Sequence, residues 1–341
     1  MIHPIRLGII GTGLAARDLH WPALRELSDR FEIVALCNHH REKAESFAAL
    51  IAGDTLEPAK PPRITTDYRE LLSWPDVDAV DIALPIALNA SVAIEALEAD
   101  KHVFLEKPIA GDLASGRRVV AAAEQHPNRV LLVAENRRYD ERFLTARRLL
   151  DEGSIGRPVM LHVDILAPTS PSSPYTATTW RITPQHLGGY LSDGGVHAAA
   201  ALQMLGGRID RVQGMIASFR PEEDPSDTLL ANLHFESGAV GHLTYSVGVA
   251  RSEPSVFRVY GTAGSLAVHN RGVMLTTDEG EREIDLSSAP NPYARELIDF
   301  YESISEGKEP AVSPLDALDD LAVIDAAFRS WREGTIVSTR F

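Results

Sequence analysis

The sequence has a single cysteine, Cys37, among its 341 residues. A disulfide needs two cysteines and a cysteine-rich metal site needs more, so the chain can form neither by itself. Long apolar runs are missing as well, since no stretch reaches the roughly 18 apolar residues of a membrane-spanning helix. Residues 1–6 lack the apolar segment of a signal peptide. We therefore expect a cytoplasmic protein with Cys37 in its core.

Basic residues are scarce relative to acidic ones. The chain has 33 Lys and Arg against 48 Asp and Glu, which gives a net charge of −15. This sign repels phosphate backbones and anionic lipids, so we expect neither a nucleic-acid nor a membrane partner. With 44% hydrophobic residues the composition is that of a globular protein. The length exceeds one ordinary core and suits two domains.

The first feature that is present is a glycine-rich turn after an apolar strand at residues 6–10. It has the G-x-G-x-x-A form of the dinucleotide-binding fingerprint and precedes a helical stretch that ends near Leu27. Gly11 permits a tight turn, Gly13 lets the backbone approach a pyrophosphate, and Ala16 lets the helix pack closely on the strand. The helix amino end favours the anion. The predicted cofactor contacts here are Gly11, Thr12, Gly13, Leu14, Ala15 and Ala16.

The end of the second predicted strand, residues 31–37, bears on the choice between NAD and NADP. An acidic residue there would bind the adenine ribose of NAD, but this chain has Asn38, followed by His39, His40 and Arg41. Without the carboxylate a 2′-phosphate is not repelled, and Arg41 can bind it, so NADP(H) is favoured over NAD(H). The alternative for Asn38 is a helix N-cap. We expect the two adjacent histidine side chains to diverge, and we expect no metal site.

Strands and helices alternate through the first 135 residues. Further strands are expected at residues 63–65, 79–83, 102–106 and 130–134, and helices at 41–50, 68–73, 89–98 and 115–125, with Asp67 as a cap. Crossovers of this length join parallel strands. The sequence therefore predicts an α/β fold, with a doubly wound parallel sheet of the Rossmann type over residues 1–135.

The strand that begins at His102 ends in Glu106-Lys107-Pro108. Ligands bind beyond the carboxyl ends of parallel strands, so Glu106 and Lys107 are expected where substrate meets cofactor. Pro108 biases Lys107 toward an extended backbone and so fixes the direction of its side chain. The alternative is a solvated charged turn, which is common in α/β proteins.

A third motif lies at residues 188–197, where four glycines surround Asp193 and His197 at a helix entrance. A spacing of four brings both side chains to one helix face. A carboxylate beside an imidazole raises its proton affinity and orients it, which suits a proton shuttle. The alternative is that Asp193 caps the helix and His197 is a core residue.

Residues 136–341 have a different pattern, in which several strands follow one another without intervening helices. Strands are expected at 158–166, 209–218, 229–235, 240–247 and 255–260, with a hairpin at Glu236-Ser237-Gly238. They predict an α+β domain with a large, mostly antiparallel open sheet. Helices are expected at 140–152 and 196–205, and the closing ones at 293–306 and 314–331 are expected to pack back on the first domain. The loop at 167–179 is long enough to be a lid. One sheet face is a candidate subunit interface.

Together the three motifs resemble those of the Gfo/Idh/MocA family of NAD(P)-dependent oxidoreductases, named for glucose-fructose oxidoreductase and inositol dehydrogenase. The resemblance implies hydride transfer between a nicotinamide and a CH–OH group of a sugar, polyol or cyclitol, in a homo-oligomer such as a dimer or tetramer. It implies that Lys107 stabilises the reacting oxygen, that His197 is the general acid/base, and that Asp193 binds hydroxyls and orients His197.

The resemblance adds further candidate residues. The cofactor set gains Leu84, Pro85, Asn89, Glu106, Lys107 and Asn136, and the substrate set comprises Lys107, Arg138, Trp180, Arg181, Asp193 and His197. The chain departs from the family pattern at Ala200, where an acidic residue is common, and at residues 85–89. Two alternatives stay open: a glycoside hydrolase that oxidises its substrate transiently with bound NAD, and a cofactor-sensing regulator without catalysis.

Overall fold

The computed structural model describes residues 4–54, 60–169, 173–175, 178–219 and 226–340. Its internal contacts divide the chain into two units. The first comprises residues 1–135 and 291–317, and the second comprises residues 136–290 and 318–341. The division passes through the helix α11 (Pro314–Glu333). Within the described residues, no helix has both the length and the apolar character needed to span a bilayer.

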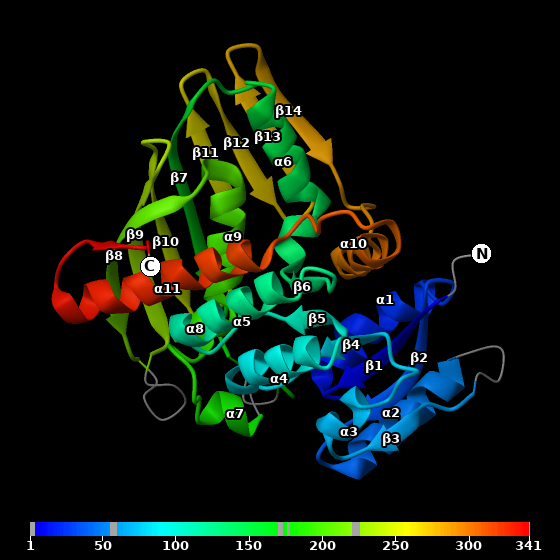
Figure 1. Ribbon diagram of the computed structural model, residues 1–341. Coiled ribbons are helices and arrows are strands. Elements are labelled where there is room, and N and C mark those ends of the chain that lie inside the picture. The colour runs from blue at the N-terminus through cyan, green and yellow to red at the C-terminus, as the bar shows by residue number, and fades with distance from the viewer. Residues whose placement is uncertain (1–3, 55–59, 170–172, 176–177, 220–225, 341) are drawn as a thin grey trace. The chain divides into compact units, whose positions relative to one another are not determined.

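The first unit is built on a six-stranded sheet in the order β3-β2-β1-β4-β5-β6 (Figure 1). All its pairs are parallel. The strands are β1 (Ile5–Ile10), β2 (Phe31–Cys37), β3 (Arg63–Thr65), β4 (Ala79–Ile82), β5 (His102–Glu106) and β6 (Leu131–Ala134). The strand order reverses direction at β1, as in a doubly wound sheet, so the predicted Rossmann fold is confirmed.

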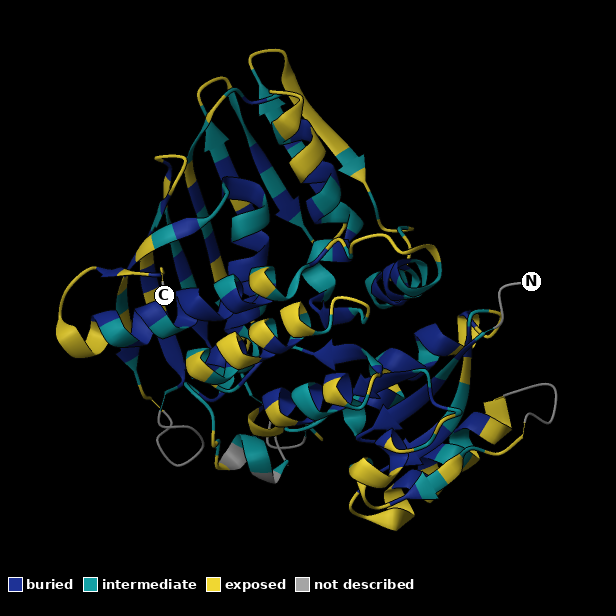
Figure 2. Cartoon of the chain, in the orientation of Figure 1, coloured by how far each residue is buried: buried dark blue, intermediate teal, exposed yellow. Residues whose placement is uncertain are grey.

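The helices of this unit follow the predicted alternation. They are η1 (Ala16–His20), α1 (Trp21–Glu26), α2 (Arg41–Asp54), α3 (Tyr68–Leu72), α4 (Ile86–Glu98), α5 (Leu113–Gln125) and α10 (Pro292–Glu306). Asp67 caps α3 as predicted, because its side chain accepts a hydrogen bond from the backbone of Arg69. Of the central strands, β4 is buried over its whole length, and β1 and β5 are buried at all but one position each (Figure 2), as expected for a sheet covered on both faces.

The second unit contains a nine-stranded sheet in the order β14-β13-β12-β11-β7-β10-β9-β8-β15. Its strands are β7 (Pro158–Leu166), β8 (Ile209–Ala217), β9 (Thr228–Phe235), β10 (Val240–Ser246), β11 (Phe257–Gly261), β12 (Gly264–His269), β13 (Gly272–Thr277), β14 (Gly280–Asp285) and β15 (Val337–Ser338). Only β7 and β10 pair in parallel among these described strands. The predicted mostly antiparallel sheet is therefore confirmed, although β12 to β15 were not predicted.

Two helices of the second unit, α6 (Glu141–Asp151) and α9 (Gly195–Gly206), cover one face of this sheet. The unit also contains the short helices η2 (Asn136–Tyr139), α7 (Thr179–Ile182) and α8 (Tyr190–Asp193). In Figure 1, α6 and α9 lie against the sheet, where they contact β7, β11, β12 and β13. On alternate positions of β7 to β10, large apolar side chains stay exposed: Met160, Met215, Leu230 and Val240. The predicted lid loop includes residues 170–172 and 176–177, which lie outside the described residues.

Candidate active site

The glycine turn after β1 contains two glycines, Gly11 and Gly13, and the requirement for glycine has a different cause at each. Gly11 has φ +100°, and a Cβ there would lie 2.2 Å from the carbonyl oxygen of Ala83. The fold itself therefore requires Gly11. Gly13 has no positive φ, and a Cβ there would meet no protein atom within 4 Å. The chain does not need a glycine at this position, whereas a pyrophosphate close to the backbone does. This open cradle fits a dinucleotide.

Ala16 is buried and begins η1, whereas Leu14 and Ala15 are partly exposed at the turn. Thr12 is 2% exposed and accepts a hydrogen bond from the Asn38 amide, with 3.0 Å between Nδ2 and Oγ1. The other end of that amide accepts the backbone N–H of His40 at 3.0 Å. Asn38 therefore ties the end of β2 to the glycine turn and closes the bend before α2. It is not the helix N-cap that was considered as the alternative, because α2 begins only at Arg41 and the N–H that Asn38 binds precedes the helix.

The expectation that the side chains of His39 and His40 diverge is wrong. Their ring centroids lie 4.0 Å apart, because both residues sit in the bend between β2 and α2 and not in an extended strand. Burial, with the neighbouring His40 and Lys43, lowers the pKa of His39. Arg41 is exposed at the start of α2 and contacts Glu45 at 3.4 Å. Imidazole and guanidinium groups thus gather at this strand end.

Buried side chains fix the Glu106-Lys107-Pro108 turn. Asn89 is fully buried, and its Nδ2 donates to the carbonyl oxygens of Glu106 and Pro108, each at 2.8 Å. The carbonyls on either side of Lys107 are therefore fixed by one side chain, and the Lys107–Pro108 peptide bond is cis. Leu84 and Pro85, also predicted as cofactor contacts, are partly exposed just before α4.

A buried histidine that sequence reasoning missed lies beneath this turn. His20 ends η1 and is 0% exposed. Its Nδ1 lies 2.8 Å from Asp81 Oδ2, and its Nε2 lies 3.0 Å from Glu106 Oε1. Burial alone would lower the pKa of His20, but the charges and hydrogen bonds of both carboxylates raise it well above its ordinary value. The signal in the sequence was Asp81, a charged residue inside a strand predicted to be buried.

In the second unit, Asp193 ends α8 and His197 lies in the first turn of α9. His197 is partly exposed although Val196 and Ala198 beside it are buried. The two short helices meet at Gly194, where a Cβ would lie 1.8 Å from the Tyr245 hydroxyl. Glycine is thus required there by close packing, and the predicted crowding of the backbone at this helix entrance is seen.

Asp193 forms an ion pair that was not predicted. Arg181 Nε lies 2.9 Å from Asp193 Oδ2, and both side chains are largely buried. The Arg181 guanidinium also lies over the Trp180 ring, 4.0 Å from its centroid. The second unit therefore brings together three of the predicted substrate residues, Trp180, Arg181 and Asp193.

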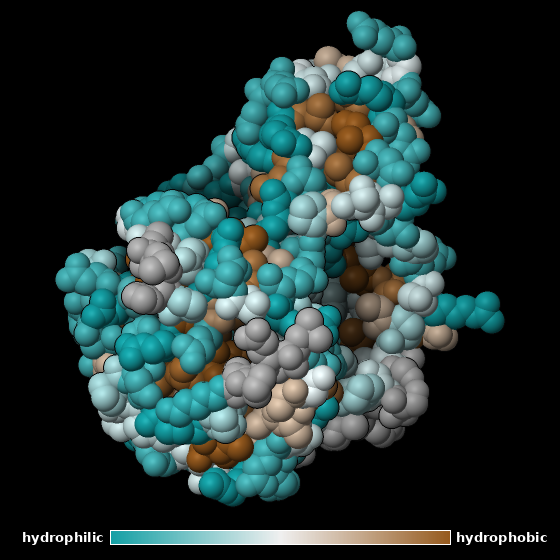
Figure 3. Space-filling model, turned by 90° about the vertical axis from the view of Figure 1, so that its right-hand side faces the viewer, coloured by the Kyte–Doolittle hydropathy of each residue, from teal (hydrophilic) through white to brown (hydrophobic). Residues whose placement is uncertain are grey.

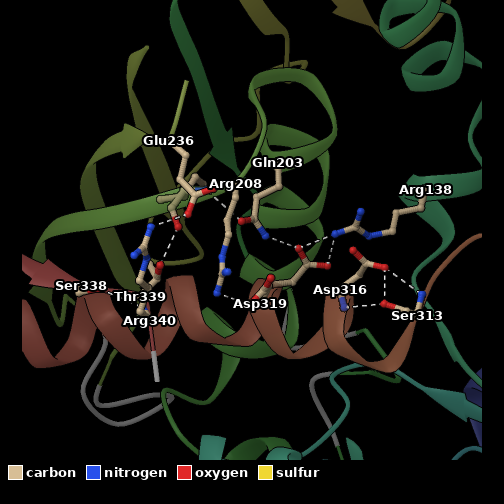
Figure 4. A network of polar contacts seen from close by, with 12 residues as sticks. Arg138, Gln203, Arg208, Glu236, Ser313, Asp316, Asp319, Ser338, Thr339 and Arg340 are labelled. Atoms are coloured by element: carbon tan, nitrogen blue, oxygen red, sulfur yellow. Dashed lines mark hydrogen bonds and ion pairs between the residues drawn. The ribbon is translucent and has the colours of Figure 1, made fainter. Parts of the chain in front are cut away.

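Arg138 and Asn136 belong to η2, which follows β6 in the chain. Arg138 Nη2 binds both carboxylate oxygens of Asp320, at 2.8 and 2.9 Å, and Gln203 binds the same carboxylate at 2.7 Å (Figure 4). Asp320 is 2% exposed, so these bonds join α11 to α9 inside the second unit. Asn136 Oδ1 is buried and has no hydrogen-bond partner among the described residues.

Comparison with known proteins assigns the chain to a class. Residues 5–134 match the model of an oxidoreductase family with an NAD-binding Rossmann fold, and residues 143–267 match the GFO/IDH/MocA C-terminal domain. The protein is an NAD(P)-dependent oxidoreductase, which confirms the predicted enzyme class. It belongs to the Gfo/Idh/MocA family, as the three sequence motifs indicated.

Relatives span the whole chain. The uncharacterized protein YMR315W of Saccharomyces cerevisiae is 33% identical over 96% of each chain. A myo-inositol 2-dehydrogenase of Thermotoga maritima is 25% identical over 96% of this chain and 97% of its own. Among solved structures, an oxidoreductase of Thermotoga maritima has a TM-score of 0.90 and 37% identity, and 99% of each chain is covered.

Proposed function

We propose that the protein catalyses reversible hydride transfer between the nicotinamide C4 and a secondary alcohol carbon of a sugar, polyol or cyclitol. The observation that carries this proposal is the fixed turn at Lys107. It follows β5 at the same edge of the parallel sheet as the glycine turn after β1. When bound, the nicotinamide supplies or accepts the hydride, and the protein must orient the carbinol carbon and move one proton.

In this proposal Lys107 hydrogen-bonds the reacting oxygen and stabilises the negative charge that develops on it. His197 gives or takes the proton, because the two ring nitrogens of an imidazole can donate and accept one. Asp193 binds substrate hydroxyls, and its ion pair with Arg181 supports this role because it fixes the orientation of the carboxylate. The similarity to the myo-inositol 2-dehydrogenase of Thermotoga maritima supports a cyclitol or polyol as substrate.

NADP(H) is our proposed cofactor in preference to NAD(H). The support is local: no carboxylate follows β2, and His39, His40 and Arg41 stand at its end. We expect Asn38→Asp to weaken NADP binding at least about tenfold more than NAD binding, because the new carboxylate repels a 2′-phosphate and accepts ribose hydroxyls. Fluorescence titration with both dinucleotides measures this. Equal losses for the two would contradict the assignment.

We also propose that a second copy of the chain covers the exposed face of β7 to β10. The apolar side chains on this face are paired in register across neighbouring strands, Met160 with Val240 and Met215 with Leu230. An apolar sheet face of this kind is typical of a subunit contact. Light scattering of the wild type and of Met215→Asp tests the contact, and an unchanged mass would refute it.

The reaction is tested by following the nicotinamide absorbance while polyols, cyclitols and keto-sugars are screened with NADP and NAD. We expect stoichiometric change of the cofactor. Lys107→Ala should bind cofactor but lose on the order of 100-fold or more in kcat. Lys308→Ala, an exposed lysine of the same unit that pairs with Glu302, is the matched control and should keep full activity.

Three other outcomes would contradict the proposal. Product release without net cofactor change would indicate a glycoside hydrolase that oxidises its substrate transiently. Cofactor binding without turnover of any substrate class would indicate a regulator. Unchanged turnover in Lys107→Ala would remove the lysine from the chemistry.

A further inference from the structure

His20 lies between two carboxylates in a part of the first unit that water does not reach. His20, Asp81 and Glu296 are 0% exposed, and Glu106 is 9% exposed. These residues come from four elements: η1, β4, α10 and β5. An ionisable residue is rarely buried without a partner, so a cluster of four requires an account of its charge.

The hydrogen bonds of His20 bear on its protonation state. A neutral imidazole has one N–H and donates to one acceptor only. Here both ring nitrogens face carboxylate oxygens, at 2.8 Å for Asp81 and 3.0 Å for Glu106. Two ionised carboxylates are satisfied only if both nitrogens carry protons. This geometry, together with the raised pKa of His20, favours an imidazolium at this position.

The fourth member of the cluster is neutral. Burial, together with the Glu106 charge, raises the pKa of Glu296 well above its ordinary value. Its two carboxyl oxygens have no hydrogen-bond partner among the described residues, which costs less free energy for a neutral carboxyl than for a carboxylate. Glu135 also acts on Glu296 by its charge. The hydrogen bonds of His20 go to Asp81 and Glu106, whereas its charge acts on Glu296 only against the larger effects of burial and the Glu106 charge.

We propose that His20 is a positioning residue that fixes the turn from which Lys107 leaves β5. Its imidazolium joins the carboxylate of Glu106 to Asp81 in the middle of β4, while Asn89 holds the backbone carbonyls of Glu106 and Pro108. The residue before Lys107 is thereby held by its side chain and its backbone together. This inference rests on the proposed function in one respect, namely that Lys107 takes part in the reaction.

The first test needs no activity. In the wild-type protein, labelled with ¹⁵N at histidine, the His20 signal should show two protonated nitrogens at a pH about two units above the ordinary imidazole pKa of roughly 6.5. The signal is assigned by its loss in His20→Gln. A neutral His20 spectrum at that pH would overturn the proposal.

The second test measures Lys107 itself. The chain has only five lysines, so acetic anhydride labelling read by mass spectrometry resolves each amine. His20→Gln removes one positive charge next to Glu106, which should raise the pKa of the Lys107 amine. Only the unprotonated amine reacts with the anhydride, so the labelling of Lys107 should slow about three- to tenfold. The other four lysines should label at unchanged rates. An unchanged Lys107 rate would overturn the proposal.

The third test uses turnover. His20→Gln should lower kcat about 10- to 100-fold with an NADP dissociation constant changed less than about threefold, because the lysine is misplaced and the glycine turn is not. Adding Asp81→Asn should restore part of kcat, since the two amides can again bridge to Glu106. His102→Gln, at the other end of β5, is the matched control and should keep full kcat.

The tests distinguish the failure of one proposal from that of the other. If the wild type shows no nicotinamide-linked turnover, the proposed function fails, while the histidine spectrum and the labelling rates still decide the role of His20. If turnover is present and His20→Gln lowers kcat no more than His102→Gln does, the positioning role is refuted and the reaction stands.

Discussion

The two glycines of the cofactor turn allow a prediction that distinguishes an effect on cofactor binding from an effect on folding. Gly13→Ala adds a methyl group where no protein atom lies within 4 Å and the backbone φ is not positive. The protein without cofactor should therefore be as stable as the wild type or up to about 1 kcal/mol more stable. The methyl group occupies space that we assign to the pyrophosphate, so we expect the dissociation constant for NADP to rise about 100-fold.

Thermal unfolding with and without cofactor gives the expected magnitude. At a free NADP concentration of 100 times the wild-type dissociation constant, bound cofactor stabilises the folded state by about 2.7 kcal/mol. For Gly13→Ala at the same concentration, the stabilisation should fall to about 0.4 kcal/mol. Scanning fluorimetry should thus show a large upward shift of Tm for the wild type and almost none for the variant.

Gly11→Ala is the matched control because the same change there should act on folding. Its Cβ would lie 2.2 Å from the Ala83 carbonyl at a positive φ, so we expect a loss of about 2 kcal/mol or more in the free energy of unfolding without cofactor. If Gly13→Ala retains the full cofactor-induced shift of Tm, no cofactor group lies against this glycine and the assignment of the turn is wrong.

Two further predictions concern buried ionisable groups, and both are measured by denaturant unfolding at several pH values. The folded-state pKa of Glu296 is raised, so the wild type has its full stability below about pH 4.3 and loses part of it as the pH rises. Glu296→Gln has no such loss, so it should be more stable than the wild type by an amount that grows with pH. An equal difference at every pH would refute a raised pKa. Burial first, and then Arg129, lower the pKa of His102 to about 4, so the wild type should lose roughly 1–2 kcal/mol as the pH falls from about 6.5 to 4, a value discounted for partial exposure. His102→Gln, which can still accept the Val130 N–H, should remove that loss.

The sequence predicted the first unit well because its signals are local. Apolar runs of four to seven residues, separated by helices, define the strands of the parallel sheet except for the three-residue β3. The strand at residues 31–37 and the cap at Asp67 were placed as the structure has them. Each depends on residues within a few positions along the chain, which is the range over which propensity and capping act.

The second unit was predicted less completely. The strands β12 to β14 were missed although glycines mark their turns at Gly264, Gly272 and Gly280. β14 is mostly exposed, so it lacks the alternation of apolar and polar residues that identifies a half-buried strand. It is held by backbone hydrogen bonds to β13, which no pattern of side chains reports. Edge strands of this kind are the hardest part of a sheet to find from sequence.

The cluster around His20 shows why a buried site is found only in part. Asp81 interrupts a strand that is otherwise apolar, and Glu296 lies on the buried face of α10. Each is costly to bury alone, so each predicts a partner without identifying it. The partners are 61 and 86 positions apart for the two His20 bonds, and η1 is a π-helical turn whose period differs from that of an α-helix. An ionisable residue inside an apolar element is therefore a reliable sign of a long-range polar contact. The face that it meets depends on the fold, which is why the lysine was predicted and the histidine beneath it was not.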